Sequence, residues 1–199
     1  MALLSTHFSR GRTAARRVLG RITFTLLGLA ALALGPAARA AGPSVEYQVK
    51  ATCLFNFAQF VDWPPAVYPK PDSPLVIGIV GNDPFGPYLD SLVADEKIGG
   101  RPIAVRRFKR AEEVVDCEIL FISGNQSIEE QKLLEHLRGH SVLTVGDSEG
   151  FNRSGGIIRF GLVGGKIRMR INMDAANAAN LRISSKILRF ASIVTPGND

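Results

Sequence analysis

The chain carries side chains that could do chemistry, but their spacing does not assemble a catalytic site. His136 and His140 are four residues apart, as zinc ligands on one helix face can be. However, Gly139 lies between them, no glutamate does, and no further Cys or His stands close in sequence to complete the three or four ligands that zinc requires. The glutamate pairs at 112–113 and 129–130 fall at predicted helix starts, where the helix dipole favours negative charge. The sequence therefore predicts no enzyme, no cofactor site and no metal site.

The only two cysteines, Cys53 and Cys117, leave two interpretations open. In an exported protein, a pair of cysteines suggests a disulfide. Free cysteine is also a good small core residue, so the two could be separate buried thiols. A lone Cys117 thiol in an oxidising compartment is a poor choice of nucleophile.

Four side chains are candidates for binding a partner protein: Trp63, Arg159, Arg168 and Arg170. Trp63 stands directly before two prolines, which predicts a rigid exit from a helix at the surface, and exposed tryptophans are common interface hot spots. Arg168 and Arg170 project from one face of a predicted strand, and Arg159 joins them across the hairpin if the register allows. The alternative is that Trp63 covers the core and that the arginines are simply solvated.

The elements that must position these residues predict an α/β fold. A recurrence of apolar residues every three to four positions predicts a largely buried helix over residues 45–61, ended by Trp63-Pro64-Pro65. Short apolar runs alternate with helical segments, which favours a mainly parallel mixed sheet flanked by helices. The predicted strands cover 75–80, 103–108, 119–122 and 141–145.

The C-terminal part of the chain has a different pattern. Residues 157–163 and 166–172 alternate around Gly164-Gly165, which predicts an antiparallel hairpin. In its second strand, Lys166, Arg168 and Arg170 point one way and the apolar residues between them point the other way. Helical segments from Asp174 and Ser184 are predicted to close the chain.

Charge segregation predicts export. Residues 1–40 contain six arginines and no acidic residue, which equals the formal net charge of +6, so residues 41–199 are net neutral. An apolar run of 13 residues follows the first five arginines and precedes Ala38-Arg39-Ala40. This is the pattern of a signal peptide cleaved before Ala41, and the run is shorter than the roughly 20 residues that span a bilayer. The sequence predicts a signal peptide over 1–40 and a single periplasmic domain over 41–199 that neither spans a membrane nor binds nucleic acid.

Three stretches, residues 50–64, 117–123 and 171–189, together resemble the YfiR family of periplasmic proteins. Residues 142–147 and 155–160 extend the resemblance in the right order. It implies a small α/β domain that is not an enzyme and that represses an inner-membrane diguanylate cyclase by binding the periplasmic sensor region of that cyclase. It also implies a homodimer, and an outer-membrane lipoprotein that can sequester the repressor. Cys53 stands where the family more often has a large apolar residue.

The sequence therefore predicts a non-catalytic regulator in cyclic-di-GMP signalling that acts by protein–protein binding. The alternative function is a periplasmic small-molecule binding protein, with its pocket at the carboxyl ends of the parallel strands near Gly81-Asn82 and Ser123-Gly124. A closed apolar cleft in the structure would favour the ligand binder, and an exposed apolar patch would favour the repressor.

Overall fold

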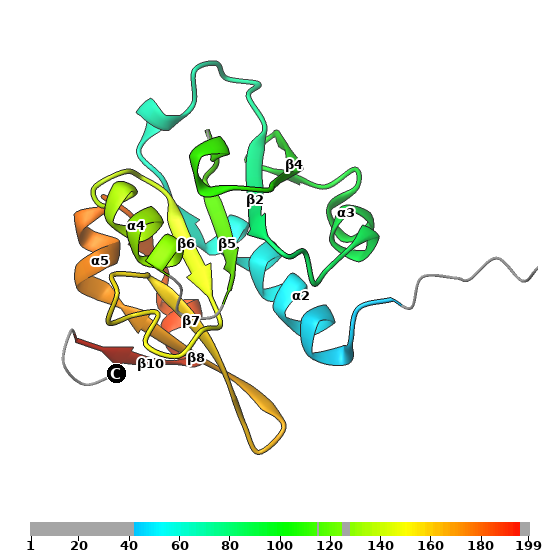
Figure 1. Cartoon of the computed structure of the whole chain (residues 1–199). Coiled ribbons are helices and arrows are strands. Elements are labelled where there is room, and N and C mark those ends of the chain that lie inside the picture. The colour runs from blue at the N-terminus through cyan, green and yellow to red at the C-terminus, as the bar shows by residue number, and fades with distance from the viewer. Residues whose placement is uncertain (1–41, 115, 125–127, 196–199) are drawn as a thin grey trace, which may run out of the picture. The chain divides into compact units, whose positions relative to one another are not determined.

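The computed structural model describes residues 42–114, 116–124 and 128–195, so the predicted signal peptide over 1–40 lies outside the described residues. The described part alternates short strands and helices, as the sequence predicts (Figure 1). Its helices are α2 (Val45–Phe60), η1 (Pro65–Val67), α3 (Pro87–Val93), η2 (Ala111–Glu113), α4 (Ile128–His136), α5 (Met173–Ala178) and α6 (Ser185–Leu188). Its strands are β1 (Val61–Asp62), β2 (Leu75–Gly81), β3 (Lys97–Ile98), β4 (Arg101–Phe108), β5 (Ile119–Ser123), β6 (Leu143–Gly146), β7 (Ile158–Val163), β8 (Lys166–Asn172), β9 (Arg182–Ile183) and β10 (Ala191–Val194).

The main sheet has the order β10-β8-β7-β6-β5-β2-β4-β3. Strands β4, β2, β5, β6 and β7 are parallel neighbours in that order, whereas β8 runs antiparallel to β7 and β3 runs antiparallel to β4. The predicted α/β class with a mainly parallel mixed sheet and a C-terminal hairpin is therefore confirmed. A separate two-stranded pair joins β1 to β9.

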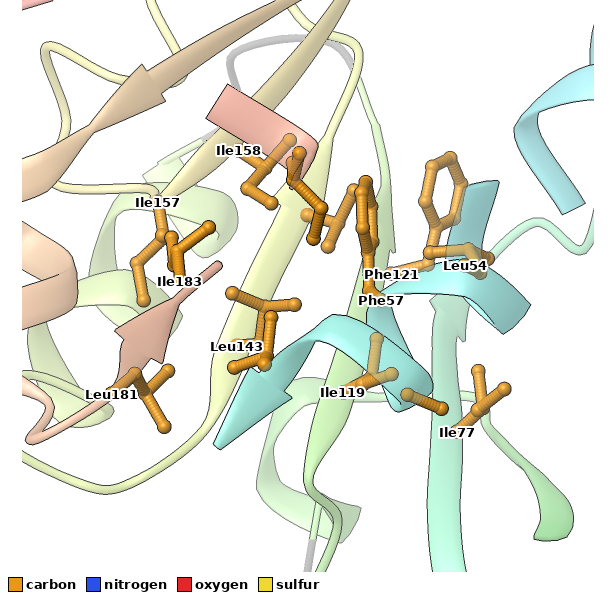
Figure 2. Close-up of a cluster of buried hydrophobic side chains, with 14 of the residues drawn as sticks. Leu54, Phe57, Ile77, Ile119, Phe121, Leu143, Ile157, Ile158, Leu181 and Ile183 are labelled. Atoms are coloured by element: carbon orange, nitrogen blue, oxygen red, sulfur yellow. The ribbon is translucent and has the colours of Figure 1, made fainter. Parts of the chain in front are cut away.

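The core has two parts because successive strand residues point to opposite faces of the sheet. On β2, Leu75, Ile77 and Ile79 belong to the larger cluster, which is covered by α2, α3, α5 and α6. Val76 and Val80 belong to the smaller cluster, which is covered by α4 and η2. Figure 2 shows part of the larger cluster, in which side chains of α2 meet those of β2, β5 and β6. Both faces of the central strands are thus buried, which explains their nearly continuous apolar sequences.

The β7–β8 hairpin forms as predicted, with Arg159 opposite Arg170 and Gly161 opposite Arg168. Gly164 and Gly165 both have positive φ values, 57° and 73°, which the tight two-residue turn requires and which glycine adopts without strain. The helical end of the chain is only partly confirmed. The two predicted helices form as α5 and α6, but the described chain continues into β10, which pairs in parallel with β8.

Helix α2 is also less buried than its sequence predicts. Its second half packs on the sheet through Leu54, Phe57 and Ala58, all of them buried. Nearer its start, Val45 is 75% exposed and Val49 44% exposed, although both belong to the same four-residue repeat. The prediction of a largely buried helix is therefore wrong at Val45 and Val49, which the surrounding elements leave exposed.

Candidate docking surface on the C-terminal hairpin

The described residues gather exposed apolar side chains and arginines around the β7–β8 hairpin. Figure 1 shows this hairpin projecting away from the rest of the sheet, with β10 beside β8. We call this region the hairpin surface and define it by Val49, Arg159, Leu162, Val163, Arg168, Arg170 and Phe190.

One side of the hairpin surface is basic. The strand register places Arg159 directly across from Arg170, and Arg168 follows on the same face opposite Gly161, which has no side chain. The register therefore allows Arg159 to join Arg168 and Arg170 across the hairpin, as the sequence analysis required. These three arginines and Arg153 line a groove of about 400 Å³ that contains one acidic residue, Glu149. The groove has a formal charge of +3, which suits an acidic partner.

Like charges at directly opposite strand positions destabilise a sheet, so the Arg159–Arg170 pair has a cost in the free protein. Part of that cost is offset because the Nε of Arg159 donates a 2.8 Å hydrogen bond to the carbonyl of Ser148. This contact also fixes the direction of the Arg159 guanidinium.

The other side of the hairpin surface is apolar. Val49 and Cys53 of α2, Met169 of β8 and Phe190 line a second groove of about 400 Å³. Phe190 is 72% exposed, an unusual state for so large an apolar side chain. Arg168 lines both grooves, so the basic and apolar sides, which face opposite ways from β8, meet at this residue. Such a patch of apolar groups rimmed by charge is typical of a protein interaction site.

A buried ion pair fixes the helix that carries Val49. The Nζ of Lys50 lies 2.6 Å from a carboxylate oxygen of Asp147 and 2.6 Å from one of Glu46, and the Tyr47 hydroxyl donates a 3.1 Å hydrogen bond to the same Asp147 oxygen. Burial opposes the charged form of Lys50, but these two carboxylates outweigh it and raise the pKa of Lys50. The pair ties α2 to the loop that follows β6, 97 residues away in sequence.

The next residue of that loop continues the network to α4. The Ser148 hydroxyl donates to both carboxylate oxygens of Glu130, at 2.8 Å and 2.9 Å. Glu130 is buried, and this burial raises the pKa of its carboxyl group, which the hydrogen bond from Ser148 partly offsets. Because Ser148 also accepts from Arg159, one short loop connects α2, α4 and the base of the hairpin.

One motif missing from the sequence-based candidates is the Gly-x-Ser-x-Gly pattern of residues 146–150. It places Ser148 after a strand, as a nucleophile elbow does. Here the serine is buried, its hydroxyl is bonded to Glu130 instead of a histidine, and it lines none of the described grooves. The motif therefore serves the loop network and presents no nucleophile to a substrate.

The two cysteines are free thiols on opposite faces of the sheet. Cys53 packs against the larger core cluster, and Cys117 is part of the smaller one. The disulfide that the sequence left open is therefore not formed in the structure, because the sheet separates the two side chains. Burial raises the pKa of Cys117 to about 12, so this thiol carries almost no nucleophilic thiolate at neutral pH.

Trp63 lies away from the hairpin surface. Its Nε1 donates a 3.1 Å hydrogen bond to the carbonyl of Glu118, which directly precedes β5. Arg159 instead lies opposite Gly146, the last residue of β6, and β5 and β6 are parallel. Trp63 and the arginines are thus at opposite ends of the strands, and the hypothesis that they form one surface needs correction.

The rings of His136 and His140 are stacked, with centroids 5.9 Å apart. Among the described residues, no group of three or more potential ligands gathers to hold a metal ion. Within the same part of the chain, every helix is too short or too polar to cross a membrane.

A further cavity, of about 340 Å³, lies where the alternative function places a ligand. Val80 and Gly81 end β2 and Ser123 ends β5, and all three line it together with Gly124. The chain order reverses between β2 and β5, because β4 lies on one side of β2 and β5 on the other. Carboxyl ends of strands at such a switch point are common ligand sites in α/β proteins.

A comparison with protein families matches residues 47–192 to a family described as YfiR/HmsC-like. The match extends from the first turn of α2 into β10 and includes the whole hairpin. A comparison with curated proteins finds no match.

Proposed function

The chain belongs to the YfiR/HmsC-like family, and from this membership we propose that it is a non-catalytic regulator that acts in the periplasm. In this proposal it binds the periplasmic sensor region of an inner-membrane diguanylate cyclase and holds that enzyme inactive. The predicted signal peptide over residues 1–40 would deliver it to the periplasm. It would act as a homodimer, and an outer-membrane lipoprotein would relieve repression by sequestering it.

The observation that carries this proposal is the hairpin surface. It joins an exposed aromatic side chain, Phe190, to a basic groove through Arg168. Apolar contact area supplies affinity, and the arginines supply orientation and a faster association rate. The partner that fits is therefore an acidic, amphipathic face of the sensor region. An exposed apolar patch of this kind is the feature that distinguishes a repressor from a closed ligand-binding protein.

Repression would work as a population shift. A sensor region that exchanges between active and inactive forms is driven to the inactive form when the regulator binds that form more tightly. The ratio of the two affinities sets the depth of repression, and moving the population from 1:99 to 99:1 needs a ratio of about 10⁴.

The experiment is to delete the gene, restore it with variants and measure cellular cyclic-di-GMP. Deletion should raise the cyclic-di-GMP concentration, and the wild-type chain should lower it again. The Arg168→Glu/Arg170→Glu double variant should be exported and folded but should not restore repression. The matched control is Arg106→Glu, which changes an exposed arginine of β4, a strand near the opposite edge of the sheet from β8. This variant should restore repression. An unchanged cyclic-di-GMP concentration after deletion would contradict the proposal.

The cavity at the β2–β5 switch point supports a second candidate function, small-molecule binding. If ligand binding were the main function, filling the cavity with a Gly124→Leu substitution would abolish regulation and leave the hairpin variants active. The docking proposal predicts the reverse: Gly124→Leu should still repress, and the hairpin variants should not.

A further inference from the structure

A cavity of about 500 Å³ lies beside Trp63, at the end of the strands remote from the hairpin surface. This volume is within the roughly 300–1,000 Å³ range of small-molecule sites. Its lining comes from two parts of the chain that are distant in sequence, the segment after α2 and the last turn of α5 with the residues that follow it. The residues used below are Asp62, Trp63, Asn177, Asn180 and Arg182.

The indole of Trp63 is held in place on one side. It packs partly buried against the larger core cluster, and its single hydrogen-bond donor, Nε1, is already used on the carbonyl of Glu118 at 3.1 Å. The indole can therefore offer only carbon surface to whatever occupies the cavity. Trp63 is therefore an apolar, preoriented wall of the cavity.

Four exposed polar side chains surround that wall. Asp62 and Arg182 are direct partners in the β1–β9 pair, and Asn177 and Asn180 add two amide groups from α5 and its end. The structure records no hydrogen bond or ion pair between these four side chains and the other described residues. Together they offer a carboxylate, a guanidinium and two amides, a mixture of donors and acceptors with no net charge.

The backbone around the cavity is preorganised. Pro64 and Pro65 fix φ on one side. On the other side, Asn180 has a positive φ of 56°, and the N–H of Leu181 donates a 3.0 Å hydrogen bond to the carbonyl of Ala176. This left-handed cap at the end of α5 explains why Asn180 adopts its conformation, and it holds the amide at the cavity.

We propose that this cavity binds a neutral saccharide of one or two pyranose rings. A pyranose has C–H faces that can lie against a fixed aromatic wall and hydroxyl groups that need both donors and acceptors at the rim. Because Asp62 and Arg182 balance each other, the cavity has no net charge to attract a charged ligand. The inference is independent of the docking function, because the site lies at the other end of the strands.

The test uses a property of the chain, namely that Trp63 is its only tryptophan. Intrinsic fluorescence of the mature protein, residues 41–199, should change saturably when it is titrated with N-acetylglucosamine or with the disaccharide chitobiose. Calorimetry should give the same dissociation constant. Co-sedimentation with purified peptidoglycan tests whether the saccharide is free sugar or part of the cell wall. Binding to peptidoglycan without binding to the free sugars would assign the site to cell-wall glycan.

The variants are Asn177→Ala and Arg182→Ala, both at exposed positions, so the melting temperature should not change. Each should weaken binding roughly three- to tenfold, the effect of losing about one hydrogen bond. Asn82→Ala, an exposed asparagine elsewhere, is the matched control and should bind like wild type. The inference is overturned if no sugar or glycan binds, if the two variants bind like wild type, or if D-glucuronate binds as tightly as the neutral sugars.

Discussion

Removing the charge of Lys50 should strongly destabilise the protein. The Lys50 side chain is only 3% exposed, and its Nζ is 2.6 Å from Asp147. Lys50→Met keeps most of the apolar stem but leaves the Asp147 carboxylate, itself only 18% exposed, without its cation. Breaking a fully buried pair by removing one partner costs about 3–5 kcal/mol. Because water reaches part of Asp147, we expect a loss of about 2–4 kcal/mol in the free energy of unfolding.

The assay is urea unfolding of Lys50→Met, Asp147→Asn and the double variant. Asp147→Asn should cost less than Lys50→Met, because Lys50 keeps Glu46 at 2.6 Å. The double variant should be more stable than the sum of the single losses, by about 1 kcal/mol or more. Lys132→Met, an exposed lysine of α4, is the control and should stay within about 0.5 kcal/mol of wild type.

A loss for Lys50→Met no larger than that of the Lys132 control would refute this reasoning, as would strictly additive losses in the double variant. Either result would mean that the ion pair does not hold α2 against the loop after β6. The position of Val49 at the apolar groove would then need another explanation.

Three further outcomes are expected. The protein purified from its native compartment should begin at Ala41, which mass spectrometry checks; a product that keeps Met1 would remove the periplasmic assignment. The denatured, unreduced protein should show two titratable thiols, from Cys53 and Cys117, and reduction should leave its melting temperature unchanged; a reading of no thiols would contradict the fold. The raised pKa of Glu130 means that the native state holds this proton more tightly than the unfolded state does, so its contribution to stability is present below the unfolded pKa of about 4.3 and is lost as pH rises through the native pKa. Urea unfolding of Glu130→Gln from pH 4 to pH 8 should therefore give a flatter profile than wild type, and an identical profile would count against a buried, titrating carboxylate.

Local patterns were enough to predict the fold class. The central strands are buried on both faces, so their sequences are continuous apolar runs that stand out from the rest of the chain. The hairpin was equally clear, because β8 alternates basic and apolar residues after a Gly164-Gly165 turn. Strand β10 was not predictable in the same way, because Ala191–Val194 is only four residues long and is a strand by virtue of its pairing with β8.

The candidate docking surface could not be predicted from the spacing of residues along the sequence, because it depends on how distant segments pack. Val45 and Val49 continue the same repeat as the buried part of α2, so periodicity could not show that the sheet fails to cover them. Trp63 and Arg168 each had the character of an interface residue, but only the strand topology places them at opposite ends of the sheet. The Lys50–Asp147 pair joins residues 97 positions apart, which no local motif indicates.

The central claim, docking through the hairpin surface, is tested most directly by the dissociation constant between residues 41–199 and the isolated periplasmic region of the cyclase encoded nearest to this gene. Phe190→Ser should weaken binding at least tenfold, since truncating a hot-spot side chain costs about 2 kcal/mol or more. Arg168→Glu/Arg170→Glu should weaken binding by a larger factor at low salt than at high salt, because salt screens the electrostatic attraction that these substitutions remove.

The matched controls for this measurement are Ile128→Ser, which removes another exposed apolar side chain, and Arg106→Glu. The account predicts that both controls bind like wild type and that all four variants keep the wild-type melting temperature. Wild-type affinity in the folded Phe190→Ser and Arg168→Glu/Arg170→Glu variants would contradict it.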